Sequence, residues 1–194
     1  MSKGRLEAFS DGVLAIIITI MVLELKVPHD AGLEALTQVL PVFLSYVLSF
    51  VYVGIYWNNH HHLLHTVKNV SGGILWANLH LLFWLSLIPF TTAWMGENHF
   101  ARAPMALYGV VLLLSGAAYK ILQCLIVKSH GADSLLSRAI GKDIKGKLSL
   151  IFYSIAIPST LISQWIASAI YVFVALMWLV PDKRIESKIT TEKG

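Results

Sequence analysis

The residues of this chain that could do chemistry lie at the start of a long apolar segment. Arg5, Ser10 and Asp11 precede a run from Gly12 to Leu23, in which Thr19 is the only polar side chain. A helix of this length spans the roughly 30 Å hydrocarbon core of a bilayer. Because an ionised side chain at membrane depth is costly and normally faces protein or water, we expect this helix to face protein or water rather than lipid.

One face of this segment carries a regular stripe. Ile16, Ile20 and Leu23 follow the spacing i, i+4, i+7, and Thr19 lies one turn from both Ile16 and Leu23. Such a stripe is typical of ordinary helix packing. It also fits a pore face, in which bulky apolar rings close by constriction and dewetting around a layer of hydroxyls. Periodicity alone leaves both interpretations open.

The densest polar feature is the run WNNHHHLLH at residues 57–65. Consecutive histidines on a helix point about 100° apart, so three adjacent ones cannot converge on one ion. His61 and His65, at i, i+4, could share one. This pair is only a weak zinc candidate, because the run contains no Cys and no carboxylate, and no metal or cofactor is assigned. The alternatives are interior hydrogen-bonding residues and solvated residues near the membrane surface.

The composition is that of a membrane protein. Of the 194 residues, 56% are hydrophobic and only 13% are charged, and the mean hydropathy is +0.68. A soluble domain would carry about a quarter charged residues. The net charge of +4 could suggest nucleic acid, but the basic residues occur in short loops, where membrane topology explains them better. No phosphate loop and no nucleophile elbow is present, so neither an enzyme nor a nucleic-acid partner is expected.

The apolar runs predict an all-α, polytopic membrane protein with six transmembrane helices in a single domain, residues 1–194. The expected spans are roughly 6–26, 36–64, 74–95, 104–127, 147–162 and 165–180. The last two come from one run that is too long for a single span, which we divide near Ser163–Gln164. Pro89 is expected to loosen the third span, and a short amphipathic helix is expected around residues 135–140.

The basic residues also predict an orientation. Of the 15 Lys and Arg residues, all but Lys26, Arg102 and Lys120 fall on the side of the N-terminus. The positive-inside rule then places both termini in the cytoplasm, in agreement with an even number of spans. The expected location is the cell membrane, crossed several times, with the lipid bilayer as an obligatory partner.

The motif Arg5-x-x-x-Phe9-Ser10-Asp11, followed directly by an apolar run, resembles the opening of the first helix in the family of transmembrane protein 175. Its members are potassium-permeable channels of lysosomes, with shorter bacterial relatives. The resemblance implies that the first helix lines the pore, and that the pore closes at an isoleucine or leucine ring, which here falls on Ile16. The pore positions that follow it outward are Thr19, Ile20 and Leu23.

The same resemblance extends to the second and third helices. Trp57 and His60 match a Trp and a His three residues later in the family's second helix, and Asn78 matches a polar position in the third. We expect His60 and Asn78 to satisfy the end of the first helix that carries Arg5, Ser10 and Asp11. Single-repeat members of the family assemble as tetramers, and the motif occurs once here, so the resemblance implies a homotetramer.

The function expected from these observations is a passive channel for potassium and other monovalent cations. The chain has no Thr-Val-Gly-Tyr-Gly filter, so selectivity must come from side chains and is expected to be modest. The Thr19 hydroxyl, which can replace part of an ion's water shell, is the candidate for favouring potassium over sodium. Two alternatives stay open: a metal transporter or membrane metalloenzyme built on the histidine cluster, and a proton-conducting pathway through Asp11 and the histidines.

Overall fold

The computed structural model describes residues 2–67, 69–129 and 143–179. All regular structure in these residues is α-helical. The helices are α1 (Lys3–Leu23), α2 (Ala35–His65), α3 (Gly72–Ser86), α4 (Ile88–Glu97), α5 (Arg102–Ser129), α7 (Ile144–Ser159) and α8 (Gln164–Leu179). The amphipathic helix expected around residues 135–140 and the charged tail lie outside the described residues.

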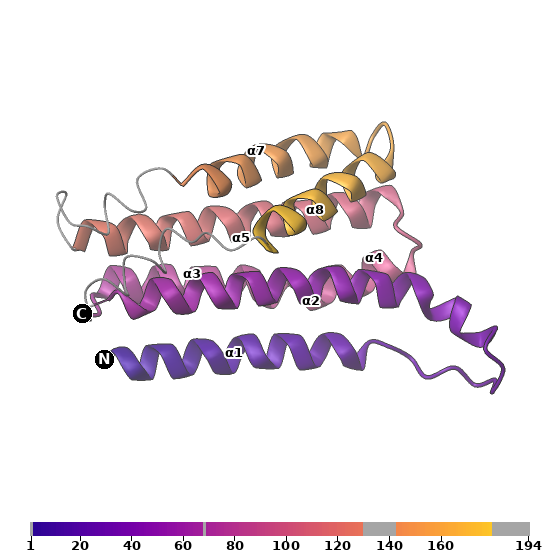
Figure 1. Ribbon diagram of the computed structural model, residues 1–194, viewed down its shortest axis with the longest axis horizontal. Helices are drawn as coiled ribbons and strands as arrows, with labels where there is room; N and C mark the ends of the chain where they lie inside the picture. Colours follow the sequence, from indigo (N-terminus) through magenta and orange to yellow (C-terminus); the bar gives the residue numbers. More distant parts are fainter. Residues whose placement is uncertain (1, 68, 130–142, 180–194) are drawn as a thin grey trace.

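The helices run side by side along the longest axis of the molecule (Figure 1). α1, α3 and α7 begin at the end of the bundle that holds the N-terminus, called here the N-terminal end, whereas α2, α5 and α8 begin at the opposite end. α1 packs against α2 on one side and against α3 and α4 on the other. α5 packs against α3, α4 and α7, and α8 packs against α7, α2 and α5.

Four stretches of helix are long and apolar enough to cross a membrane: α1, α2, α3 with α4, and α5. α8 is a shorter apolar helix. The ends of the observed helices differ from those of the expected spans by three residues or fewer, because apolar runs bounded by polar residues and Pro fix where a membrane helix can begin and end.

The third expected span is two helices rather than one. α3 ends at Ser86 and α4 begins at Ile88, two positions after it, with Leu87 between them. Pro89 explains the break, because it has no N–H to donate to the carbonyl of Leu85 and its ring crowds that carbonyl. The Thr91 hydroxyl occupies part of the interrupted hydrogen-bonding pattern by donating to the carbonyls of Leu87, at 3.2 Å, and Ile88, at 3.1 Å.

The long apolar run near the C-terminus divides close to the predicted point. α7 ends at Ser159 and α8 begins at Gln164. The turn between them is closed by the carbonyl of Ser159, which accepts from the backbone N–H of Ile162 at 3.0 Å and of Ser163 at 2.9 Å. The result is a tight antiparallel pair that leaves two helices of 16 residues each.

The interior consists of two apolar clusters. One is built from α1, α2, α3 and α5, with Ile88 at the start of α4. The other joins α2, α4, α5, α7 and α8 around four buried tyrosines, Tyr52, Tyr108, Tyr153 and Tyr171. α5 and α8 approach closely at Gly109, where any Cβ would collide with the Tyr171 hydroxyl. α1 therefore belongs to the first cluster only, and the second forms a separate layer behind α2.

Candidate functional site

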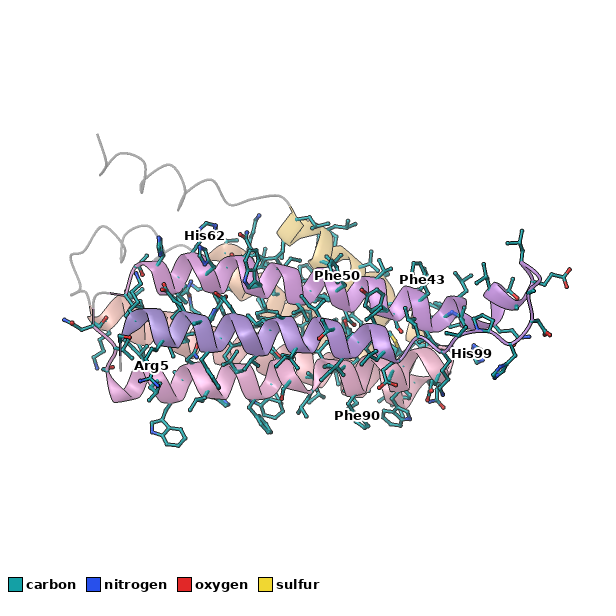
Figure 2. All side chains as sticks on the ribbon, turned by 90° about the horizontal axis from the view of Figure 1, so that it is seen from below. Arg5, Phe43, Phe50, His62, Phe90 and His99 are labelled. Carbon is teal, nitrogen blue, oxygen red and sulfur yellow. The ribbon has the colours of Figure 1, made fainter. Side chains whose placement is uncertain are left out.

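The first helix has two different faces. One face carries a buried stripe of Leu6, Ser10, Leu14, Ile17 and Met21. The opposite face is exposed: Ile16 is 57%, Ile20 42% and Leu23 79% accessible. Figure 2 shows α1 lying between α2 and α3–α4, with the side toward the viewer free of other helices. The stripe of Ile16, Ile20 and Leu23 is therefore not buried against another helix of the same chain.

Thr19 lies on the same exposed side of α1. Its hydroxyl donates to the backbone carbonyls of Ile16, at 2.9 Å, and Ala15, at 3.1 Å. A hydroxyl has one proton and two acceptor lone pairs. Because the proton is used on the helix's own backbone, what Thr19 offers to its surroundings is an oxygen acceptor, the group that coordinates an alkali cation.

The buried face of α1 is held by a directional chain of hydrogen bonds. The Ser10 hydroxyl donates to the Leu6 carbonyl at 2.8 Å, and Asn78 Nδ2 donates to Ser10 Oγ at 2.9 Å. Asn78 Oδ1 and His60 Nε2 are 2.6 Å apart. Since the amide oxygen can only accept, the imidazole must donate through Nε2–H. Ser10, His60 and Asn78 are all at most 1% exposed, so this network is closed to solvent.

Asp11 takes a different partner from the one expected. The indole of Trp57 donates from Nε1 to Asp11 Oδ1 at 3.1 Å. Asp11 is only half-buried and Trp57 is exposed, so the bond lies at the edge of the α1–α2 contact. Within the described chain the hydrogen bonds of His60 and Asn78 hold Ser10 and not Asp11, because only Ser10 shares the buried stripe of α1.

The other two motif residues lie outside this network. Arg5 is exposed near the start of α1 (Figure 2). In residues 2–67, 69–129 and 143–179 it makes no ion pair within 4.0 Å. The Phe9 ring is 50% exposed. The expected pairing of Arg5 with His60 and Asn78 is thus absent from the described residues of the single chain. The side chains of Arg5 and Phe9 are both exposed on the surface of α1.

The histidine pair lies beside a carboxylate that sequence reasoning missed. The rings of His61 and His65 stack with their centroids 5.5 Å apart. His65 Nδ1 is 3.7 Å from Glu7 Oε1, and Lys3 Nζ is 3.8 Å from the same oxygen. Glu7 could have been found from the antiparallel pairing of α1 and α2, which brings both N-terminal-end residues together. Within the described residues, no set of three or more His, Cys, Asp and Glu side chains could hold a metal ion.

The opposite end of α1 is tied to α4. Lys26 Nζ, just beyond the helix, is 2.6 Å from Glu97 Oε1 at the end of α4. The hydrogen bond to Glu97 raises the pKa of Lys26, so the ion pair persists across the physiological range. Exposed pairs of this kind contribute little stability. The pair instead fixes the position of α1. The helix is held by Ser10 in its first half and by Lys26 just beyond its last residue, while the face that carries Ile16 stays uncovered.

A groove continues that uncovered face. It runs between α1 and α3–α4, and its α1 wall includes Ile16 and Ile20, while its other wall includes Pro89, Phe90 and Trp94. Phe90 points out of the bundle (Figure 2). The exposed stripe of α1 and this groove form one continuous apolar surface on the molecule.

Comparison with known proteins agrees with this architecture. Residues 5–89 match the family described as endosomal/lysosomal potassium channel TMEM175. A potassium channel of Chryseobacterium sp. (strain P1-3) is 58% identical over 189 residues, which cover 97% of this chain and 98% of that protein. The endosomal/lysosomal proton channel TMEM175 of Gallus gallus is 43% identical over 75 residues, 32% of this chain and 15% of that protein.

The fold is also that of a solved relative. The crystal structure of a lysosomal potassium-selective channel TMEM175 homolog from Chamaesiphon minutus superposes with a TM-score of 0.80 at 29% identity, covering 92% of this chain and 96% of that one. Sequence, fold and apolar helices thus point the same way. The chain is a multi-pass protein of the cell membrane and belongs to the TMEM175 family.

Proposed function

We propose that this protein is a potassium-permeable cation channel whose pore is lined by α1 of several identical chains. The observation that carries the proposal is the contrast between the two faces of α1. One face is fastened inward through Ser10, while Ile16, Thr19, Ile20 and Leu23 on the other remain uncovered. The relatives whose names state an activity are channels, which supports transport rather than catalysis.

The pore requires more than one chain, since a single helix cannot enclose it and identical subunits close around a symmetry axis. We propose a homotetramer, in which α1 faces the axis and the groove between α1 and α3–α4 receives a neighbouring chain. In this arrangement α7 and α8, each about 24 Å long at 1.5 Å per residue, complete six spans in one domain, with both termini in the cytoplasm.

The gate is assigned to Ile16. Four isoleucine side chains around an axis would form an apolar ring, and a narrow apolar constriction excludes water and therefore ions. Ile20 and Leu23 extend the apolar lining for about 10 Å along the helix. Opening would then require only a small outward movement of α1, which the network at Ser10 and the Lys26–Glu97 pair would both resist.

Selectivity is assigned to Thr19. Its proton is donated to backbone carbonyls of α1, so the lone pairs of its oxygen stay available to an ion. Four such oxygens can replace part of the water around a weakly hydrated cation, whereas a strongly hydrated one loses more than they return. This mechanism favours potassium over sodium by a modest factor, since it lacks the closely spaced carbonyl rings of a dedicated filter.

The histidine cluster gives little support to a metal-dependent function. A metal transporter or metalloenzyme would need His61 and His65 to share carboxylates within the chain. Among the residues that the structure describes, Glu7 is the one carboxylate within 4.0 Å of His65. We assign this cluster to the α1–α2 contact instead.

The experiment that tests the proposed function is potassium flux into liposomes containing the purified protein. Flux no greater than in protein-free liposomes, with the protein shown to be folded and inserted, would contradict it.

A further inference from the structure

One side of α2 carries large apolar residues that no described helix of the same chain covers. They recur alternately three and four residues apart, which is the spacing of helices that pack side by side. This set, called here the α2 seam, consists of Leu40, Phe43, Val47, Phe50, Gly54 and Trp57. Its large members are exposed and Gly54 is partly exposed. The α2 seam is therefore a helix-packing surface without a partner in the described part of the chain.

A second uncovered surface lies along α3 and α4. Its members, called here the aromatic flank, are Trp76, Phe83, Phe90 and Trp94. The first three follow one another at seven-residue intervals, and all four side chains are exposed. Figure 2 shows Phe43 and Phe50 on the α2 side of α1, and Phe90 on the α3–α4 side. The α2 seam and the aromatic flank therefore lie on opposite sides of α1.

Two hydrogen bonds set the relative depths of these surfaces in the membrane. Trp57 is level with Asp11, and Asn78 is level with Ser10. α2 runs opposite to α1, whereas α3 runs in the same direction (Figure 1). Counted from these bonds, Gly54 is level with residue 14 of α1 and Phe83 with residue 15, a difference of about 1.5 Å. A rotation about an axis parallel to the helices leaves these depths unchanged.

Gly54 forms a hollow in the α2 seam. It lies between the exposed side chains of Phe50, four residues earlier, and Trp57, three residues later. A Cβ atom placed on Gly54 would meet no atom within 4 Å, so the space beside it is open. Small residues let membrane helices approach closely, and a hollow at this depth can receive the Phe83 ring of a second chain.

The outer half of the α2 seam corresponds in the same way to the groove beside α1. Val47 lies ten residues before Trp57 and is therefore level with residue 21 of α1, one residue from Ile20. The groove, about 550 Å³ in volume, is lined there by Ile20, Pro89 and Phe90. The side chains of Phe43 and Phe50 flank Val47 along the α2 seam. The groove thus receives apolar side chains at the depth where it has room for them.

The composition of both surfaces points to a protein partner rather than lipid. The exposed large side chains of α7 are all aliphatic: Ile144, Leu148, Ile151 and Ile155. The α2 seam and the aromatic flank are instead rich in aromatic residues, which are enriched where proteins contact one another. At roughly 100 Å² for each half-exposed large side chain, the two surfaces together bury about 1,000 Å², the minimum expected of a specific interface.

We propose that the α2 seam of one chain docks on the aromatic flank and the adjoining groove of a second copy of the same chain. The contact joins two different surfaces, so it repeats from chain to chain and closes into a ring. Phe83 of one copy enters the hollow at Gly54 of the next. The inference rests on the proposed function, in which α1 faces the axis of that ring, and it names the surfaces that join the copies. Ile16 and Ile20 are then supported from the groove side by α2 of the adjacent copy.

The first test is an exchange of side-chain size. Gly54→Leu fills the hollow, and we expect it to raise about tenfold the protein concentration at which half of the chains are assembled, measured by light scattering in detergent. Adding Phe83→Ala to Gly54→Leu should restore assembly, because it removes the ring that the new side chain displaces. Ser154→Leu is the matched control. Ser154 is exposed on α7 and, within the described part of the chain, bonds only to its own helix at Leu150, so assembly should not change. Unchanged assembly in Gly54→Leu, or a further loss on adding Phe83→Ala, would overturn the proposal.

The second test uses disulfide cross-linking and does not depend on Gly54→Leu folding well. Cys124, the single cysteine of the chain, is first replaced by serine. Chains with Gly54→Cys and chains with Phe83→Cys are then produced together and oxidised in the membrane. We expect covalent dimers in the mixture and none from either chain alone. Dimers from Gly54→Cys chains alone would indicate a contact between two α2 seams and would overturn the proposal.

Potassium flux through the parent separates this inference from the proposed function. If the mixture gives no covalent dimers while the parent conducts potassium, the proposed channel stands and the copies join elsewhere. If the mixture gives dimers while the folded parent conducts no potassium, the contact is supported and the proposed pore is wrong.

Discussion

Asn78 donates a hydrogen bond to Ser10 at 2.9 Å, across the contact between α3 and α1. The oxygen of the same amide lies 2.6 Å from His60 Nε2, so the three residues tie α1, α2 and α3 together. Between helices in a membrane such bonds contribute modestly, about 0.6 kcal/mol on average. Leaving one partner unpaired is more costly than the bond is favourable.

Replacing Asn78 should therefore destabilise the protein more than losing two hydrogen bonds suggests. Asn78→Leu leaves the His60 Nε2–H without an acceptor and Ser10 Oγ without its donor, at about 1–3 kcal/mol for each buried group left unsatisfied. The melting temperature of the purified protein in detergent checks this. Ser86→Ala is the matched control on α3, because the Ser86 hydroxyl is exposed and, within the described part of the chain, bonds only to its own helix at Phe83; its melting temperature should not change.

Asp11 should matter less to stability than Ser10 does. Its bond to Trp57 lies at a half-exposed position, so we expect Asp11→Ala to cost about 1 kcal/mol or less. Trp57→Phe removes the same donor and keeps an aromatic ring, so the double variant should cost little more than either single one. A loss of stability in Asp11→Ala that equals the loss in Asn78→Leu would show that Asp11 has further partners in the assembled protein.

The difference between Ser10 and Asp11 could have been taken from helical periodicity. Ser10 shares a face with Leu6, Leu14 and Ile17, whereas Asp11 lies about 100° further round the helix. His60 and Asn78, in contrast, were identified only through the family resemblance, because no pattern within one sequence says which polar residues of different helices will meet. The proximity of Glu7 to His65 depends in the same way on the pairing of α1 with α2.

The positions of the helices could be predicted from the sequence more closely than the contacts between the site residues could. Apolar length sets where a membrane helix can lie, so the expected spans and the division near Ser163–Gln164 correspond closely to the observed helices. Ser49 and Tyr52 share a face of α2 that in the sequence is typical of ordinary packing. Only the structure shows that the Ser49 hydroxyl lies 3.0 Å from the Tyr108 hydroxyl and that the Tyr52 ring packs edge-on against the ring of Tyr108. The positions around a pore axis stay a prediction, because they depend on other copies of the chain.

The gate prediction concerns Ile16. Since this side chain is 57% exposed within the chain, Ile16→Asn should not disturb the fold, and four amides in place of an apolar ring should keep the constriction wet. We expect resting potassium flux in liposomes to rise severalfold. Val22→Asn is the matched control, because Val22 is also exposed on α1 but lies about 240° round the helix from Ile16. Equal increases in both variants, or an intact protein with unchanged flux in Ile16→Asn, would place the gate elsewhere.

The selectivity prediction concerns the Thr19 hydroxyl, the single side-chain oxygen on the exposed face of α1 between Ile16 and Leu23. Thr19→Val keeps the shape of the side chain and removes the oxygen, whereas Thr19→Ser keeps the oxygen and removes a methyl group. A tenfold preference between two ions corresponds to about 1.4 kcal/mol, within reach of a few hydroxyl contacts. The ratio of potassium to sodium permeability, measured from reversal potentials under bi-ionic conditions, should approach one in Thr19→Val and persist in Thr19→Ser. A ratio that survives in Thr19→Val would assign selectivity to the apolar rings, because dehydration at Ile16 and Ile20 would then be the step that separates the two ions.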